Sequence, residues 1–190
     1  MNELQHYLSS YFGVLDAVQL EKLSAQFKVQ RLAKGDYFLK TGQQCDKLSF
    51  IKSGILRIYV STLEKDVTQW ISTKGYFVTD LSSFVFATPA RWNIQALVDV
   101  EIYTISKADY LNIGKIVPEW NELEKLFIAK CFTMLEDRIF SHLSMSAEER
   151  YEFFFENNKE LFNQVPLQYI ASMLGMTPET FSRIRKKQLK

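Results

Sequence analysis

The chain has 190 residues, with 23 Lys and Arg against 22 Asp and Glu, and 47% of its residues are hydrophobic. This length is enough to bury a core in one or two small domains, and the balanced charge is typical of a soluble globular protein. No apolar run approaches the roughly 20 residues needed to span a bilayer. The first residues also lack the basic and apolar segments of a signal peptide. We therefore expect a cytoplasmic protein.

Metal and redox chemistry have few ligands available in this sequence. Cys45 and Cys131 are the only cysteines, lie far apart and belong to no CxxC motif, while His6 and His142 are the only histidines. Structural zinc and iron–sulfur centres need clusters of these residues. We expect two reduced thiols, and no metal site.

The first 27 residues predict two helices that pack against the rest of the chain. Residues 2–12 place Leu4, Leu8 and Phe12 at helical spacing. A second helix is predicted to begin at Asp16, because Gln19 stands three residues later in the position of a capping-box partner.

The sequence pattern changes between residues 29 and 105, where short runs of residues that favour β-strands alternate with turn signals. The predicted strands are 37–39, 48–51, 55–60, 67–71, 92–97 and 101–105. Four glycines punctuate this region where the chain must reverse: Gly35, Gly42, Gly54 and Gly75. Many short strands at regular spacing favour an antiparallel barrel or double-sheet roll, whose interior is able to hold a small ligand.

A long helix is predicted from Pro118 to about Leu143. Its apolar positions keep a roughly heptad step, and the stripe is too long for one small roll to cover, so we expect a dimer seam. The alternative is a helix that packs only against its own domain. The residues predicted to form the dimer helix are Trp120, Leu123, Phe127 and Met134.

The last part of the chain predicts a helix-turn-helix. Ser146 and Glu149 form a capping box that opens one helix. A second helix is predicted after Pro166 and is ended by Gly175, and a third begins where Thr177 can act as N-cap before Pro178. Two short helices joined by a tight turn describe the motif that places its second helix in the DNA major groove. The alternative is an ordinary helical hairpin, but residues 166–190 hold five basic residues against one acid, which favours a phosphate-binding face.

This order of elements resembles the Crp/Fnr family of bacterial transcription regulators over nearly the whole chain. The roll carries the glycine frame Lys34-Gly35-Asp36, Thr41-Gly42, Leu48 to Gly54 and Lys74 to Phe77, and the second domain carries Ile170-Ala171-Ser172-Met173-Leu174-Gly175 and Glu179-Thr180-Phe181-Ser182-Arg183. The resemblance implies an α+β fold: an antiparallel β-roll like a cyclic nucleotide-binding domain, flanking helices, a long dimerisation helix and a C-terminal helix-turn-helix domain. The expected domains are residues 1–116, 117–144 and 145–190.

In that family a Glu and an Arg that match Glu179 and Arg183 read the bases. A Glu near the helix start is able to accept from a cytosine amino group, and an Arg one turn later to donate to guanine. Pro178 departs from the family, which often has Arg or another polar group there. Since the chain ends at Lys190, we also expect the usual β-wing to be absent. The predicted DNA-binding residues are Gln168, Thr177, Pro178, Glu179, Thr180, Ser182, Arg183, Lys186 and Lys187.

The roll lacks the usual contacts for cyclic AMP. Family members that bind it use a Gly-Glu segment before a short helix and an Arg-Ser pair after it. Here Asp80 is the nearest acid, and Arg91 is followed by Trp92. The aromatic residues nearby either line a pocket for another ligand or simply fill the core. The candidate effector pocket consists of Tyr76, Phe77, Asp80, Leu81, Ser82, Ser83, Arg91 and Trp92.

The first hypothesis is a sequence-specific, dimeric, DNA-binding transcription regulator with an effector-sensing roll. Its partners would be double-stranded DNA and a second copy of the chain, and the resemblance adds RNA polymerase and a small-molecule effector as candidate partners, with no membrane and no resident cofactor. The alternative is a small-molecule sensor, cyclic nucleotides included, or a protein-interaction module with a degenerate DNA-binding head. An enzyme is not expected, because residues 29–105 contain no His to hold a catalytic metal in the roll.

Overall fold

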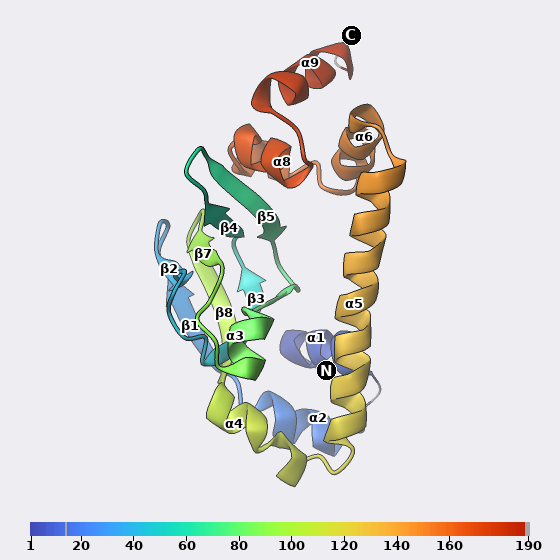
Figure 1. Cartoon of the computed structure of the whole chain (residues 1–190). Coiled ribbons are helices and arrows are strands. Elements are labelled where there is room, and N and C mark those ends of the chain that lie inside the picture. Colours follow the sequence, from blue (N-terminus) through green and yellow to red (C-terminus); the bar gives the residue numbers. More distant parts are fainter. Residues whose placement is uncertain (14, 189–190) are drawn as a thin grey trace. The chain divides into compact units, whose positions relative to one another are not determined.

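The computed structural model describes residues 1–13 and 15–188, and it divides into two compact units (Figure 1). The roll unit contains Met1–Ile58 and Ser72–Phe132, and the C-terminal unit contains 59–71 and the chain from Thr133 onward. The long helix is thus shared between the units, and a hairpin segment of the roll belongs with the C-terminal unit. No helix among the described residues has the length and apolar character needed to cross a membrane.

The strands form two four-stranded sheets in the orders β1-β8-β3-β6 and β2-β7-β4-β5. The pairings of β8 with β1 and β3, of β2 with β7 and of β3 with β6 are antiparallel, which confirms the predicted α+β fold with an antiparallel roll. The strands are β1 (Lys28–Leu32), β2 (Tyr37–Leu39), β3 (Lys47–Ser53), β4 (Leu56–Ser61), β5 (Asp66–Ser72), β6 (Phe77–Val78), β7 (Asn93–Ala96) and β8 (Val100–Ser106).

Gly54 lies where a side chain cannot be accommodated. Its φ is +94°, and an added Cβ would lie 2.9 Å from the Cα of Val100 and would also clash with the carbonyl oxygen of Asp99. At Gly35, with φ +92°, the same Cβ would meet nothing within 4 Å. Both glycines supply the left-handed backbone that the turns require, but only Gly54 is also constrained by its neighbours.

Helices α1 (Glu3–Phe12) and α2 (Ala17–Ser24) begin at side-chain caps. The predicted capping box of α2 is confirmed, since the carboxylate of Asp16 accepts from Gln19 N and the amide of Gln19 accepts from Asp16 N. Helix α1 packs into the roll core through Tyr11 and Phe12, whose rings lie 6.1 and 4.9 Å from that of Phe127. Helix α1 is therefore a packing element, and α2 buries Leu20 and Leu23.

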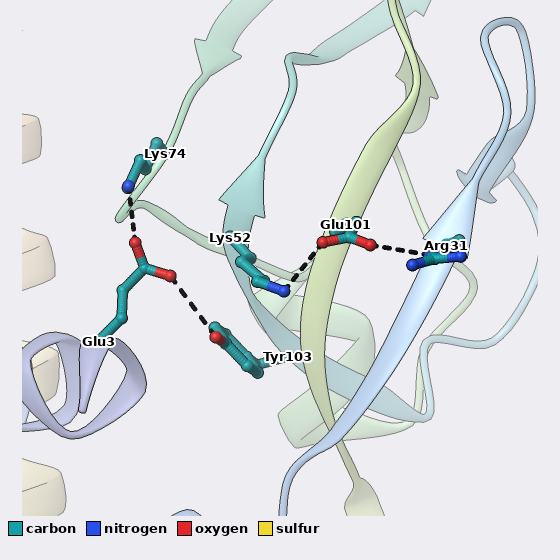
Figure 2. Close-up of polar contacts among 6 residues, drawn as sticks. All are labelled: Glu3, Arg31, Lys52, Lys74, Glu101 and Tyr103. Carbon is teal, nitrogen blue, oxygen red and sulfur yellow. Dashed lines mark hydrogen bonds and ion pairs between the residues drawn. The ribbon is translucent and has the colours of Figure 1, made fainter.

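Polar side chains bind α1 and three strands together on the outer surface of the sheet (Figure 2). Glu3 of α1 pairs with Lys74 at 2.6 Å and accepts a long hydrogen bond from the Tyr103 hydroxyl at 3.5 Å. On β8, Glu101 lies between Arg31 of β1 and Lys52 of β3, at 2.7 and 2.9 Å. The hydrogen bond from Lys74 lowers the pKa of Glu3, and those from Lys52 and Arg31 lower the pKa of Glu101.

Three short helical segments of the roll unit were not predicted as elements. They are α3 (Leu81–Phe86), α4 (Lys107–Leu111) and the 3₁₀ turn η1 (Ile113–Lys115). Asp80 caps α3 and Ser106 caps α4, each by accepting from a backbone N–H three residues later. Such short helices depend on their caps and on tertiary contacts rather than on propensity.

Helix α5 (Trp120–Ser144) presents two apolar faces, and this corrects part of the predicted dimer helix. Trp120, Leu123 and Phe127 are buried in the core of the roll unit, so these three residues are not available to a partner, and Met134 is half-buried. A second stripe is exposed instead: Ile128, Phe132, Leu135, Ile139 and Leu143. The sequence placed both stripes in one seam because heptad and helical spacing differ little over a few turns.

The described part of the C-terminal unit continues with four helices: α6 (Ala147–Asn157), α7 (Leu161–Gln164), α8 (Leu167–Met173) and α9 (Pro178–Gln188). The predicted capping box of α6 is confirmed by the reciprocal bonds between Ser146 and Glu149. The predicted second domain includes residues 189–190, which lie outside the described residues.

Candidate nucleic-acid interface

Helices α8 and α9 form the predicted helix-turn-helix (Figure 1). Gly175 has φ +70° in the turn, as expected for the residue that ends a helix in the left-handed conformation. Thr177 then caps α9, because its hydroxyl oxygen accepts from Thr180 N at 3.2 Å. Pro178 occupies the first position of α9, where its missing N–H costs nothing.

An aromatic cluster fixes the inner face of α9. Phe181 and Ile184 are buried, and the ring of Phe181 lies 5.1 Å from Tyr151 and 5.9 Å from Phe162. Because Phe181 and Ile184 are turned into the core, the residues at the helical positions between them face outward. The helix is therefore held with one defined face toward solvent.

The outer face of α9 carries the two residues expected to read bases. Glu179 and Arg183 are both exposed and lie four residues apart, so they share one side of the helix. Hydrogen bonds to the Glu179 carboxylate, from its own backbone N–H and from the Thr177 side chain, lower its pKa. A carboxylate kept ionised in this way remains a pure acceptor, which suits an amino group such as that of cytosine.

The two lysines near the end of α9 differ in their surroundings. Lys187 donates to both carboxylate oxygens of Glu148 on α6, each at 3.0 Å, and so has an intramolecular partner that the sequence did not predict. Among the described residues Lys186 forms no ion pair, and it is exposed. Of the two predicted phosphate contacts, Lys186 is the one whose ammonium group has no ionic partner among the described residues.

The turn between α8 and α9 is held by contacts that sequence reasoning missed. Ser172 Oγ accepts from Thr68 N at 2.9 Å, the guanidinium of Arg138 donates to Met173 O at 3.3 Å, and that of Arg150 donates to Leu174 O at 3.1 Å. Arg138 also lies 5.1 Å from the centre of the Trp70 ring. Two arginines thus satisfy carbonyls at the end of α8, which helices otherwise leave unpaired.

Two polar members of the candidate effector pocket, Asp80 and Ser83, are hydrogen-bonded within the chain. Asp80 is only 2% exposed, and its carboxylate accepts from Ser83 N at 3.0 Å and Arg91 N at 2.9 Å. Ser83 is buried and its hydroxyl oxygen accepts from Cys45 N. These contacts give Asp80 and Ser83 structural roles.

The apolar members of the same group divide between core and surface. Phe77 packs against Tyr11 and Phe127, at 5.4 and 5.0 Å between ring centres, which favours core filling for this residue. Leu81 and Trp92 also pack against the core, and Arg91 lies 5.6 Å over the Trp92 ring. Tyr76 and Ser82 are half-buried.

Residues 29–115, a little under half of the chain, match the family model of the cyclic nucleotide-binding domain. Solved structures extend the similarity across both units. A CooA mutant from Carboxydothermus hydrogenoformans superposes with a TM-score of 0.65 at 21% identity, over 93% of this chain and 86% of that one.

The c-di-GMP-responsive regulator CLP from Xanthomonas campestris has a TM-score of 0.65 at 15% identity, over 92% of each chain. The sensor domain of the regulator DNR from Pseudomonas aeruginosa has a TM-score of 0.57 at 25% identity, over 75% of this chain and 95% of that one. A search of curated proteins found no significant match. The domain model and these folds support the resemblance to Crp/Fnr regulators.

Proposed function

We propose that this protein is a sequence-specific DNA-binding transcription regulator of the Crp/Fnr type, and that it acts as a homodimer. The observation that carries the proposal is the outer face of α9, where the Glu179 carboxylate and the Arg183 guanidinium are exposed one helical turn apart, above the buried Phe181 and Ile184. That pair offers an acceptor for cytosine and a two-pronged donor for guanine. Lys186 adds a cation suited to the DNA backbone.

The homodimer is supported by the exposed apolar stripe of α5. Ile128, Phe132, Leu135 and Ile139 follow one another at steps of four, three and four residues, which is the spacing of a coiled-coil seam. Their exposed fractions range from 45% to 60%, so a monomer would leave a large apolar surface in water. A second copy of the same helix is the partner that matches this spacing. RNA polymerase is a further expected partner of such a regulator.

The first experiment is the selection of binding sites from random duplex DNA by the full chain. We expect a near-palindromic site, and Arg183→Ala should weaken binding to it by roughly 1–3 kcal/mol while relaxing the preference at one base pair. Arg31→Ala, which removes the same charge from an exposed position on β1, is the control and should leave specific binding unchanged. Equal loss by Arg183→Ala on selected and random DNA contradicts the base-reading role.

The match of residues 29–115 to a cyclic nucleotide-binding domain favours a second candidate function, a small-molecule sensor whose DNA-binding head is degenerate. A thermal-shift screen with cyclic AMP, cyclic GMP and cyclic di-GMP separates the two. The internal bonds of Asp80 lead us to expect no shift with cyclic AMP. A ligand that stabilises the chain, together with failure to select any DNA site, would favour the sensor.

A further inference from the structure

A groove flanks the base-reading residues of α9. It has a cavity volume of about 250 Å³. Leu167 and Gln168 of α8 line one side, and residues of α9, the first of which is Pro178, line the other. Phe181 forms its apolar floor, with Ser182 beside it. Neither the volume nor this lining follows from the role assigned to Glu179 and Arg183.

The surface that Leu167, Pro178 and Phe181 give to the groove is apolar. Phe181 is 1% exposed, and its ring packs against those of Tyr151 and Phe162. Leu167 is half-buried, and the Pro178 ring presents carbon atoms and no backbone donor. A ligand group that enters this groove therefore gains by leaving water, not by hydrogen bonding to its floor.

The groove is positioned beside the reading face. Pro178 and Ser182 stand one residue before Glu179 and Arg183, so each is displaced by about 100° around the same turn of the helix. The remaining lining residues are Arg185 and Lys186, which add two cations to the groove. Apolar surface beside two cations matches an apolar group of a ligand that also carries phosphates.

Duplex DNA exposes one prominent apolar group on its base edges in the major groove, the 5-methyl group of thymine. A small apolar metabolite would make no use of the cations, and a free anion would make no use of the floor. We propose that this groove receives the 5-methyl group of a thymine next to the base pair read by Glu179 and Arg183, and that Leu167 and Pro178 select that thymine. The proposal rests on the proposed DNA-binding function and adds one element of its sequence preference.

Pro178, where the Crp/Fnr family often has Arg or another polar group, gains a role as an apolar contact. A polar residue at 178 would offer a hydrogen bond to a base edge, whereas Pro178 offers an apolar contact. The half-site is therefore expected to contain a thymine that is recognised through its methyl group, beside base pairs recognised through hydrogen bonds.

The test replaces each thymine of the selected site, one at a time, by deoxyuridine. This change removes the methyl group and leaves the hydrogen-bonding edge intact. We expect one position in each half-site at which affinity falls about fourfold, the effect of losing one buried methyl-sized group. At the other thymines the loss of affinity should be less than fourfold.

Two variants assign the effect to the groove. In Leu167→Ala and in Pro178→Ala the same deoxyuridine substitution should change affinity less than twofold, with circular dichroism confirming that each variant is folded. Pro178 is exposed, so its replacement leaves the core intact even if Leu167→Ala destabilises the unit.

The outcomes separate this inference from the function on which it rests. If a sugar ring fills the groove instead, no deoxyuridine substitution should change the affinity for the selected site. That result would overturn the thymine proposal but not the proposed DNA-binding function. A sensitive thymine whose effect persists in both variants also overturns the thymine proposal. If no site is selected from random DNA, the proposed function fails first.

Discussion

At the scale of single residues, two lysines of α9 that look equivalent in the sequence have different surroundings. Lys187 is held by Glu148, whereas Lys186 has no ionic partner among the described residues. An exposed ion pair is weak, but it must be broken before Lys187 can neutralise a phosphate. The two side chains should therefore contribute unequally to DNA binding.

We expect Lys186→Ala to lower the slope of log affinity against log salt by about one for each recognition helix, and Lys187→Ala to lower it less. Glu148→Gln should steepen the slope, because it frees Lys187 without changing its position on α9. The measurement is binding to a random duplex at several salt concentrations. Equal effects of the two lysine variants would mean that the ion pair with Glu148 does not persist in solution.

At the scale of elements, the sequence was informative wherever the determinants are local. The capping boxes of α2 and α6, the Gly175 turn and the Thr177 cap each depend on residues within a few positions of one another, and all are present. Edge strand β1 was missed because most of its residues are exposed and its pairing with β8 lies far along the chain. Local pattern carries little information about such a partner.

In the candidate site, too, the features set by neighbouring residues were predictable and those set by distant residues were not. The outward direction of Glu179 and Arg183 follows from the apolar spacing of Phe181 and Ile184, and was predictable. The bonds of Arg138 to Met173 and of Thr68 to Ser172 were not, since 35 and 104 residues separate the partners. The wrong assignment of Trp120 and Phe127 to a dimer seam has the same origin: the sequence shows that a face is apolar but not what covers it.

The ion pairs of Glu101 with Arg31 and Lys52 link β8 to β1 and β3. The pKa of Glu101 is lowered in the folded chain. The stabilising contribution of these ion pairs is therefore present above the unfolded pKa of about 4.3 and is lost as the pH falls through the lower folded value. Glu101→Gln should lower the melting temperature slightly at pH 7, and the two melting curves should converge below pH 4.

Melting followed by circular dichroism between pH 7 and pH 3 measures this convergence. Glu64→Gln is the control, because Glu64 is exposed and forms no ion pair among the residues that the structure describes. A difference between wild type and Glu101→Gln that stays constant with pH would show that the ion pairs do not cause it.

The exposed stripe of α5 makes a prediction about assembly. Leu135 is 47% exposed at the middle of the stripe, and Leu135→Glu should place two carboxylates opposite each other across a seam, converting dimer to monomer in sedimentation velocity. Leu111→Glu makes the same change at a site that is 71% exposed on α4, and should leave the dimer intact. Dissociation by both variants would point to a general effect of charge.

At the scale of the whole molecule, dimerisation and base reading make one joint prediction about DNA. Two recognition helices related by a twofold axis meet successive major grooves, so their half-sites should be centred about 34 Å, or one helical turn, apart. Inserting about five base pairs between the half-sites rotates one of them to the far side of the duplex and should reduce affinity to that of a single half-site. Leu135→Glu provides the internal comparison: a monomer should bind the original and the lengthened site equally. Wild-type affinity that does not change on insertion would contradict binding as a dimer, even if Arg183 reads its base as proposed.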